Sequence, residues 1–159
     1  MAAAPQPQSM SETAQHELVI TRTFDAPRSL VFKAWTQPEH MVRWLGPHTY
    51  TAISAKMDVR PGGGYRAGMR SPDGKEHWMR GIYREIAEPE RLVFTFSWEG
   101  KEGELGRENA ISITFADLDG KTRMTFRHGF FETVENRDEH NKGWSQCFER
   151  LAAYLANER

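Results

Sequence analysis

The stretch Asp138–Asn157, DEHNKGWSQCFERLAAYLAN, decides the fold expected for this chain of 159 residues. At 100° per residue, its large apolar side chains fall within an arc of about 120°, the width of a helical stripe that faces a core. These side chains are Trp144, Cys147, Phe148, Leu151, Tyr154 and Leu155. Asn136, followed three residues later by Glu139, predicts a capping box at the helix start.

Gly143 lies in the first turns of this helix, where glycine costs about 1 kcal/mol relative to alanine. Beside Trp144, it indicates either that another group approaches the backbone closely or that the helix start frays. Both interpretations stay open on the sequence alone.

The chain upstream of this helix alternates mainly with the period of strands. Glu17–Phe24 predicts a first strand, and Pro27 and Pro38 then begin two short helices. From Tyr50 onward, apolar residues recur at every second position, and Asp119-Gly120 predicts a tight hairpin. The six later strands are expected at about 50–59, 65–69, 76–87, 92–98, 111–115 and 122–128.

This order predicts an α+β fold in which a curved antiparallel sheet of about seven strands wraps round the long C-terminal helix. Two short helices follow the first strand. Only the terminal helix has the length and the stripe to cover the apolar face of the sheet. Such a half-barrel grip tends to keep an interior space.

Composition excludes several classes of function. With 21 basic and 22 acidic residues, the formal charge of −1 argues against nucleic acid as the main partner. No apolar run approaches the roughly 20 residues that span a bilayer. Residues 1–15 have neither a basic region nor an apolar core, so they predict a disordered tail rather than a signal peptide. Translation from Met10 stays open.

We therefore expect a single domain over residues 16–159 in a cytoplasmic protein. One cysteine, Cys147, forms no internal disulfide and suits a reducing compartment. The six histidines lack the HExxH spacing, so neither a metal nor a cofactor is predicted. Gly62-Gly63-Gly64 lacks the Gly-Lys-Ser/Thr of a phosphate-binding loop, and no GxSxG elbow exists.

His128 is the polar residue with the clearest functional potential. It shares the parity of Met124 and Phe126, so it should point where they point. If they face the grip, its imidazole lies near the pocket mouth, where it could bind a ligand carbonyl or transfer a proton. A histidine hydrogen-bonded at a strand end is the interpretation we favour. Cys147 is interpreted as a small buried hydrophobe, and Asp58 with Arg60 as an ion pair at a turn.

Many large aromatic and methionine side chains from several helices and strands predict an adaptable apolar cavity. The alternative is that they simply pack the core. Five tryptophans, nine phenylalanines, four tyrosines and seven methionines supply them. The candidate ligand-binding residues are Trp35, Trp44, Met57, Tyr65, Met69, Trp78, Phe94, Phe96, Trp98, Ile111, Phe126, His128, Trp144, Cys147 and Phe148.

Several motifs carry a resemblance to a known family. Asp58-Val59-Arg60-Pro61-Gly62-Gly63 resembles the strand-turn signature of the Hsp90-ATPase-activator-homologue branch of the START-like (SRPBCC, Bet v 1-like) superfamily. The other matching pieces, in order, are 32–39 (FKAWTQPE), 44–47 (WLGP), 81–86 (GIYREI), 89–95 (PERLVFT), 122–128 (TRMTFRH) and 143–144 (GW). A departure is Leu45, where this branch commonly has a second tryptophan at the expected pocket entrance.

The resemblance covers about Glu17–Asn157 and implies a helix-grip fold with a hydrophobic pocket between the long helix and the sheet. The superfamily includes lipid and hormone carriers, polyketide cyclases, ring-hydroxylase subunits and a co-chaperone that stimulates Hsp90. Fold analogy alone does not choose among these activities.

Three functions therefore compete. The first, which we favour, is the binding of a small hydrophobic molecule or lipid in the cavity. The second is a cyclase- or hydrolase-type enzyme that uses His128 with a carboxylate such as Glu76 or Glu99. The third is a co-chaperone-like module of the stress response, ranked last because 159 residues leave no room for the activator's further chaperone-binding domain. A homodimer through an exposed strand edge stays open.

Overall fold

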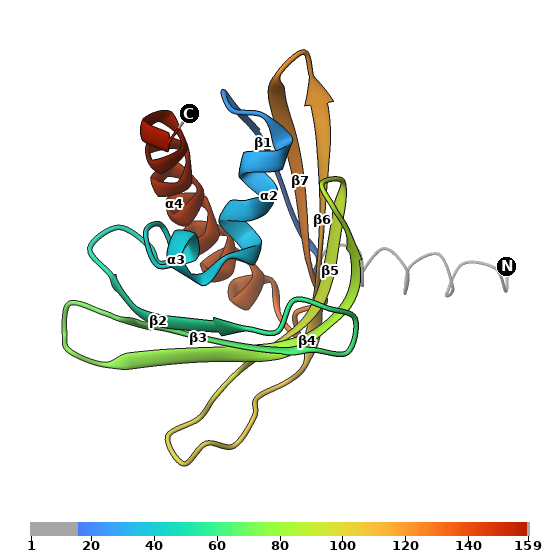
Figure 1. The fold of residues 1–159 in the computed structure, drawn as a ribbon. Helices are drawn as coiled ribbons and strands as arrows, with labels where there is room; N and C mark the ends of the chain where they lie inside the picture. The colour runs from blue at the N-terminus through green and yellow to red at the C-terminus, as the bar shows by residue number, and fades with distance from the viewer. Residues whose placement is uncertain (1–15, 159) are drawn as a thin grey trace, which may run out of the picture.

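A single seven-stranded antiparallel sheet forms the frame of residues 16–158, the part of the chain that this computed structural model describes (Figure 1). The strands are β1 (Leu18–Phe24), β2 (Thr51–Met57), β3 (Gly64–Arg70), β4 (Glu76–Ala87), β5 (Arg91–Trp98), β6 (Asn109–Leu118) and β7 (Lys121–Gly129). All seven predicted strands are present, with ends that shift by a few residues. The predicted tail over 1–15 and the question of Met10 lie outside the described residues.

The strand order, β1-β7-β6-β5-β4-β3-β2, follows from hairpins between neighbours along the chain. The exception is β1, which pairs with β7 from Leu18 opposite His128 to Phe24 opposite Thr122. Helices α2 (Arg28–Thr36) and α3 (Pro38–Met41) then carry the chain across to β2 at the other edge. The first and second strands therefore bound the same concave face from opposite sides.

The sheet bends sharply between β4 and β5. The regular pairing stops after Arg80 opposite Ser97 and resumes at Tyr83 opposite Phe94. In the gap, the backbone N–H of Ile82 donates to the hydroxyl of Thr95, across 2.9 Å. In Figure 1 the half of the sheet with β2, β3 and β4 lies across the half with β6 and β7. The sheet therefore has the half-barrel shape expected from the sequence, here called the grip.

The long helix α4 (Val134–Glu158) lies on the concave side of this grip (Figure 1). Its buried residues are the six of the predicted stripe: Trp144, Cys147, Phe148, Leu151, Tyr154 and Leu155. The helix begins four residues earlier than expected, and the backbone N–H of Asn136 donates to the hydroxyl of Thr133 across 3.0 Å. The predicted capping box at Asn136 is therefore wrong, because Asn136 already lies within the helix.

The interior between α2, α4 and the sheet is largely filled by aromatic rings. The Trp35 ring lies 4.8 Å from Trp44, 6.1 Å from Phe126 and 5.9 Å from Phe148, between ring centres. All four side chains are almost fully buried. Aromatic pairs at these separations contribute about 0.5–1.5 kcal/mol each beyond the burial of their area.

The predicted α+β helix-grip fold is confirmed.

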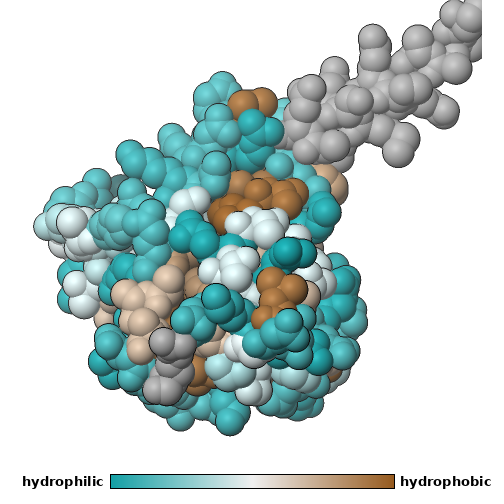
Figure 2. Space-filling view, turned by 90° about the horizontal axis from the view of Figure 1, so that it is seen from above, coloured by the Kyte–Doolittle hydropathy of each residue, from teal (hydrophilic) through white to brown (hydrophobic). Residues whose placement is uncertain are grey.

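On the face shown in Figure 2, hydrophobic residues appear as small separate patches among hydrophilic ones. Within residues 16–158, no helix combines the length and the apolar character needed to cross a membrane.

Candidate functional site

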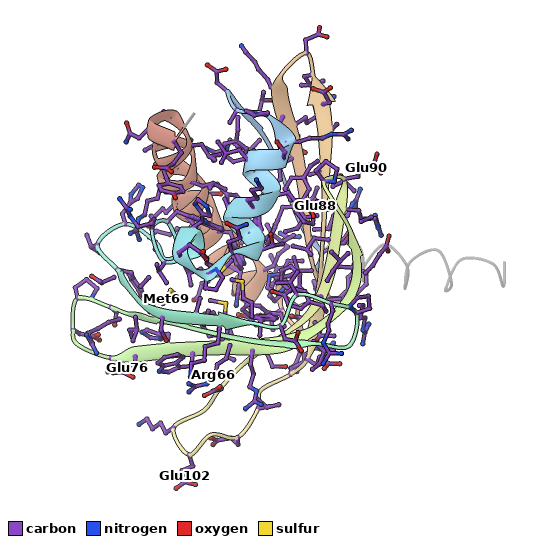
Figure 3. All side chains as sticks on the ribbon, in the orientation of Figure 1. Arg66, Met69, Glu76, Glu88, Glu90 and Glu102 are labelled. Atoms are coloured by element: carbon purple, nitrogen blue, oxygen red, sulfur yellow. The ribbon has the colours of Figure 1, made fainter. Side chains whose placement is uncertain are left out.

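A cleft of about 250 Å³ opens between the N-terminal half of α4, the inner face of β3 and β4, and the segment 45–50. Its walls are mostly apolar. The lining residues are Leu45, Pro47, Tyr50, Met69, His77, Met79, Trp98, Glu139, His140, Gly143, Trp144 and Cys147. Figure 3 shows Met69 on the side of β3 that faces the helices.

Gly143 leaves this cleft open on the side of α4. A side chain there would have only the Pro47 ring within 4 Å of its Cβ, at 3.8 Å. The glycine therefore costs the helix stability without relieving a clash, since an alanine would fit. Its effect is to leave room beside Trp144. The close approach to the backbone that the sequence suggested is not made by any part of residues 16–158.

The opposite wall of the cleft is the segment Leu45–Tyr50, which is tied to α4 by Arg150. One guanidinium nitrogen of Arg150 lies 2.9 Å from the carbonyl oxygen of Gly46 and 3.2–3.3 Å from those of Leu45, Pro47 and Tyr50. Charged donors make stronger hydrogen bonds than neutral ones. The two N–H groups of this nitrogen are shared among the four carbonyls, so the shape of the cleft depends on a cation round which these carbonyls converge.

Deeper in the grip, packing leaves only a void of about 20 Å³. Three residues, Leu45, Met79 and Trp144, border both this void and the cleft. Among residues 16–158, the indole N–H of Trp35 beside the void is the buried side-chain donor that lacks a hydrogen-bond partner. A void of this size accommodates about one water molecule, which requires polar neighbours such as this N–H.

His128 is fully buried and points inward, as its parity predicted. Its Nε2 lies 2.8 Å from the amide oxygen of Asn109, and its Nδ1 accepts from the indole N–H of Trp144 across 3.2 Å. An amide oxygen only accepts, so Nε2 carries the proton and the ring is neutral. Burial, with a smaller contribution from His140, holds the pKa of His128 well below its usual value. His128 is not among the residues that line the cleft.

The ring of His140, at the mouth of the cleft, also has a hydrogen-bond partner at each of its two nitrogens. Its Nδ1 lies 2.8 Å from the backbone carbonyl of Asn136, which only accepts, and its Nε2 accepts from the indole N–H of Trp98 across 3.0 Å. Both ring nitrogens are therefore occupied. Two tryptophan–histidine pairs thus fix the wall of the cleft near the start of α4.

Cys147 lines the cleft as part of its apolar wall. Burial raises the pKa of its thiol to about 12. At neutral pH the group is therefore the thiol and not the nucleophilic thiolate. The interpretation of Cys147 as a small hydrophobe agrees with this environment.

Trp78 does not face the interior, and this corrects the sequence prediction. Its ring lies under the guanidinium of Arg66 at 3.9 Å, and its N–H donates to Glu76 across 2.9 Å. Figure 3 shows Arg66 and Glu76 on the side of the sheet away from the helices. Glu99 joins this outer face through two hydrogen bonds from Arg66. Neither carboxylate offered as a partner of His128 therefore reaches it.

The remaining candidates fall into three groups. Met69, Trp98, Trp144 and Cys147 meet at the cleft. Seven others are buried in the packed core: Trp35, Trp44, Phe94, Phe96, Ile111, Phe126 and Phe148. Met57 and Tyr65 are half-buried beside the small void. Asp58 and Arg60 form the predicted ion pair, with 2.8 Å between Nε and Oδ2.

Several residues of the cleft are not among the candidates predicted from the sequence, above all His77, Tyr50 and Met79. His77 and Met79 alternate with Trp78 along β4, so choosing the other face of this strand would have found both. Within the described chain, no group of three or more histidine, cysteine, aspartate or glutamate side chains is placed to hold a metal ion.

A bent antiparallel sheet that grips one long helix over a cleft defines the helix-grip class of α+β proteins. The family described as Activator of Hsp90 ATPase homolog 1-like protein matches residues 25–156, and the chain belongs to this family. The predicted resemblance is thereby confirmed.

Solved structures of bacterial proteins share the fold. The AHSA1 protein of Silicibacter pomeroyi is 21% identical with a TM-score of 0.80, over 90% of this chain and 99% of that one. A protein from Nitrosomonas europaea is 24% identical with a TM-score of 0.77, over 91% and 97%. No curated protein matches the chain. At these identities the likeness shows the fold alone.

Proposed function

We propose that the protein binds a small, flat, apolar molecule in the cleft between α4 and the inner face of β3 and β4. The observation that carries this proposal is the cleft of about 250 Å³ with its largely apolar wall, beside a core that is otherwise filled. Sites for drug-sized ligands measure about 300–1,000 Å³. A compound of one or two rings fits this space better than a long-chain lipid.

The geometry favours binding over catalysis by His128. Both nitrogens of that ring are occupied by Asn109 and Trp144, and burial disfavours its charged form. Acid–base chemistry requires a ring that can gain and lose a proton next to the substrate. A cytoplasmic location, a link to the stress response, a stable dimer and chaperone stimulation remain predictions of the sequence and family resemblance.

The test is ligand binding with and without free space at Gly143. Purified protein would be titrated with naphthalene, the dye 8-anilinonaphthalene-1-sulfonate and decanoate, with tryptophan fluorescence and the melting temperature as readouts. We expect the ring compounds to bind and to raise the melting temperature, because a ligand of the folded state stabilises it.

The blocking variant is Gly143→Leu, which places a side chain in the cleft and improves helix propensity by about 1 kcal/mol. It should melt at or above the wild-type temperature but bind none of the ring compounds. Lys142→Leu, on the exposed neighbouring position, is the matched control and should bind normally. If the wild-type protein binds no probe, or if Gly143→Leu binds as well as wild type, the proposal is wrong.

A further inference from the structure

A chain of three hydrogen-bonded side chains ends at the cleft. At the turn between β3 and β4, the hydroxyl of Ser71 donates to a carboxylate oxygen of Asp73. The same hydroxyl oxygen lies 3.1 Å from Nε2 of His77. His77 lies near the start of β4, on the face of the strand that points inward. Ser71 itself is buried.

This chain fixes which nitrogen of His77 carries the proton. The other neighbours of the Ser71 hydroxyl are the Asp73 carboxylate and the carbonyl of Lys75 at 3.2 Å, and both only accept. The hydroxyl must donate to one of them, so Nε2 of His77 must donate to the hydroxyl oxygen. Hydrogen bonds from Ser71 and from the Lys75 backbone lower the pKa of Asp73, which keeps the carboxylate ionised. In the neutral imidazole, the nitrogen left to accept is then Nδ1 of His77.

His77 presents its ring to the cleft. It is paired with Met69 across β3 and β4, it lines the cleft with Met69 and Met79, and its ring lies 5.7 Å from that of Tyr50. Within residues 16–158, Nδ1 of His77 has no hydrogen-bond donor. The other imidazole of the wall, His140, has both nitrogens occupied by Trp98 and Asn136. Glu139 is the charged group of the lining, and it is exposed.

We propose that the ligand of this cleft is a hydroxyl-bearing aromatic compound whose O–H donates to Nδ1 of His77. The inference rests on the proposed binding function and names its ligand class. The aromatic ring lies against the tryptophan and methionine walls, and the hydroxyl donates to the histidine nitrogen of the cleft wall that residues 16–158 leave without a donor. Ser71 and Asp73 act as positioning residues, because they hold the imidazole in the tautomer that accepts.

The proposal predicts selectivity between two compounds of nearly equal shape. 2-Naphthol carries the donor, whereas 2-methoxynaphthalene has the same rings without it. A net hydrogen bond of about 0.5–1.5 kcal/mol corresponds to a preference of roughly 2- to 12-fold, and we expect about tenfold in favour of 2-naphthol. The pair is tested at pH 7 by isothermal titration.

The matched variant is His77→Phe, which keeps an aromatic ring beside Tyr50 but removes the acceptor. It should lose the preference for 2-naphthol over 2-methoxynaphthalene, because neither compound then meets a ring acceptor at this position. Ser71→Ala tests the positioning role through the nitrogen-15 shifts of the His77 ring. These shifts should report the Nε2–H tautomer in the wild type and a mixture of tautomers in Ser71→Ala, a change that a merely structural role would not produce.

Each result decides the matter. Equal affinity for both compounds in the wild type overturns the ligand class while leaving apolar binding in place, and so does a preference that persists in His77→Phe. Binding of neither compound overturns both proposals. A wild-type ring with the proton on Nδ1 also overturns the inference.

Discussion

The indole N–H of Trp144 on α4 donates to Nδ1 of His128 on β7, across 3.2 Å inside the protein. Together with Asn109 on Nε2, this bond occupies the imidazole in its neutral form. Helix and sheet are therefore joined at this point by a histidine that must stay uncharged. The same contact also withdraws His128 from chemistry in the cleft.

This relationship predicts that the fold weakens as the medium becomes acidic. An unfolded histidine titrates near pH 6.5, and the pKa of His128 in the folded protein is well below that value. Its contribution to stability is complete above pH 6.5 and is lost as the pH falls below it, because the unfolded chain then binds the extra proton. The slope reaches about 1.4 kcal/mol per pH unit.

The measurement is urea unfolding between pH 8 and pH 5 for the wild type and His128→Gln. The variant should be less stable at pH 8 but lose less stability on acidification. Phe131→Leu is the control, because it alters packing 4.6 Å from the same ring without removing a titratable group. It should keep the wild-type slope. Parallel slopes for the wild type and His128→Gln would refute this account.

The core cluster predicts a large effect at Phe148. This side chain is fully buried and packs against the rings of Trp35, Phe126 and Trp144. Phe148→Ala should lower the free energy of unfolding by about 3–5 kcal/mol, since a cavity remains among rings held by other elements. Lys142→Ala, exposed on the same helix, should stay within about 0.5 kcal/mol. A loss below about 1 kcal/mol at Phe148 would show that the cluster collapses freely.

How well the sequence predicts the inward-facing residues of a helix or strand depends on whether only one of its faces is apolar. The stripe of α4 was predicted residue by residue because its helical period leaves one apolar side. The inner face of β4 was not, because Trp78 and Ile82 alternate with Met79 and Tyr83, and both sets are apolar. The stacking of Arg66 on Trp78 places the Trp78 face of β4 on the outside of the sheet. This stacking depends on the register of β3 with β4.

The site was less predictable than the fold for a related reason. Whether Trp35, Trp44 and Phe148 enclose a cavity or fill it depends on volumes and rotamers that no periodicity reports. The cleft lies instead where Gly143 omits a side chain, and the sequence pattern marks that glycine as unusual without indicating a cavity there. His77 was missed because its role comes from Ser71 and Asp73, whose residue types alone indicate a turn.

Arg150 predicts a local effect on the wall of the cleft. Removing the guanidinium in Arg150→Ala takes away the cation and the two N–H donors round which four carbonyls of residues 45–50 converge. We expect a loss of about 1.5–3 kcal/mol, as for hydrogen bonds to charged groups, with faster hydrogen exchange confined to the peptide that spans 45–50. Alanine is a good helix former, so α4 itself should persist.

The control for this experiment is Arg123→Ala on β7, an exposed arginine whose loss should leave exchange in 45–50 unchanged. Exchange that speeds up over the whole of α4 would instead mean that the variant destabilises the helix. In that case the clamp would not be specific to the segment.

The bend of the sheet predicts that Gly81 tolerates no side chain. A Cβ there would lie 1.9 Å from the carbonyl oxygen of Thr95 and 2.8 Å from the Tyr65 ring. The first contact is with backbone, so relief requires β4 and β5 to separate where Thr95 already replaces a regular pairing. Gly81→Ala should therefore cost about 3 kcal/mol, at the upper end of typical overpacking.

Gly106→Ala is the matched control, because its Cβ would meet only the carbonyl of Trp98 at 3.4 Å, an ordinary contact. Thermal and urea unfolding of both variants measure the difference. The tyrosine ring over Gly81 belongs to the inner face, so Gly81→Ala should also shift the ring signals of Tyr65 and Phe94, which lie 5.3 Å apart. If Gly81→Ala is as stable as Gly106→Ala, the two strands are not in contact at the bend, and the grip is held by packing on α4 alone.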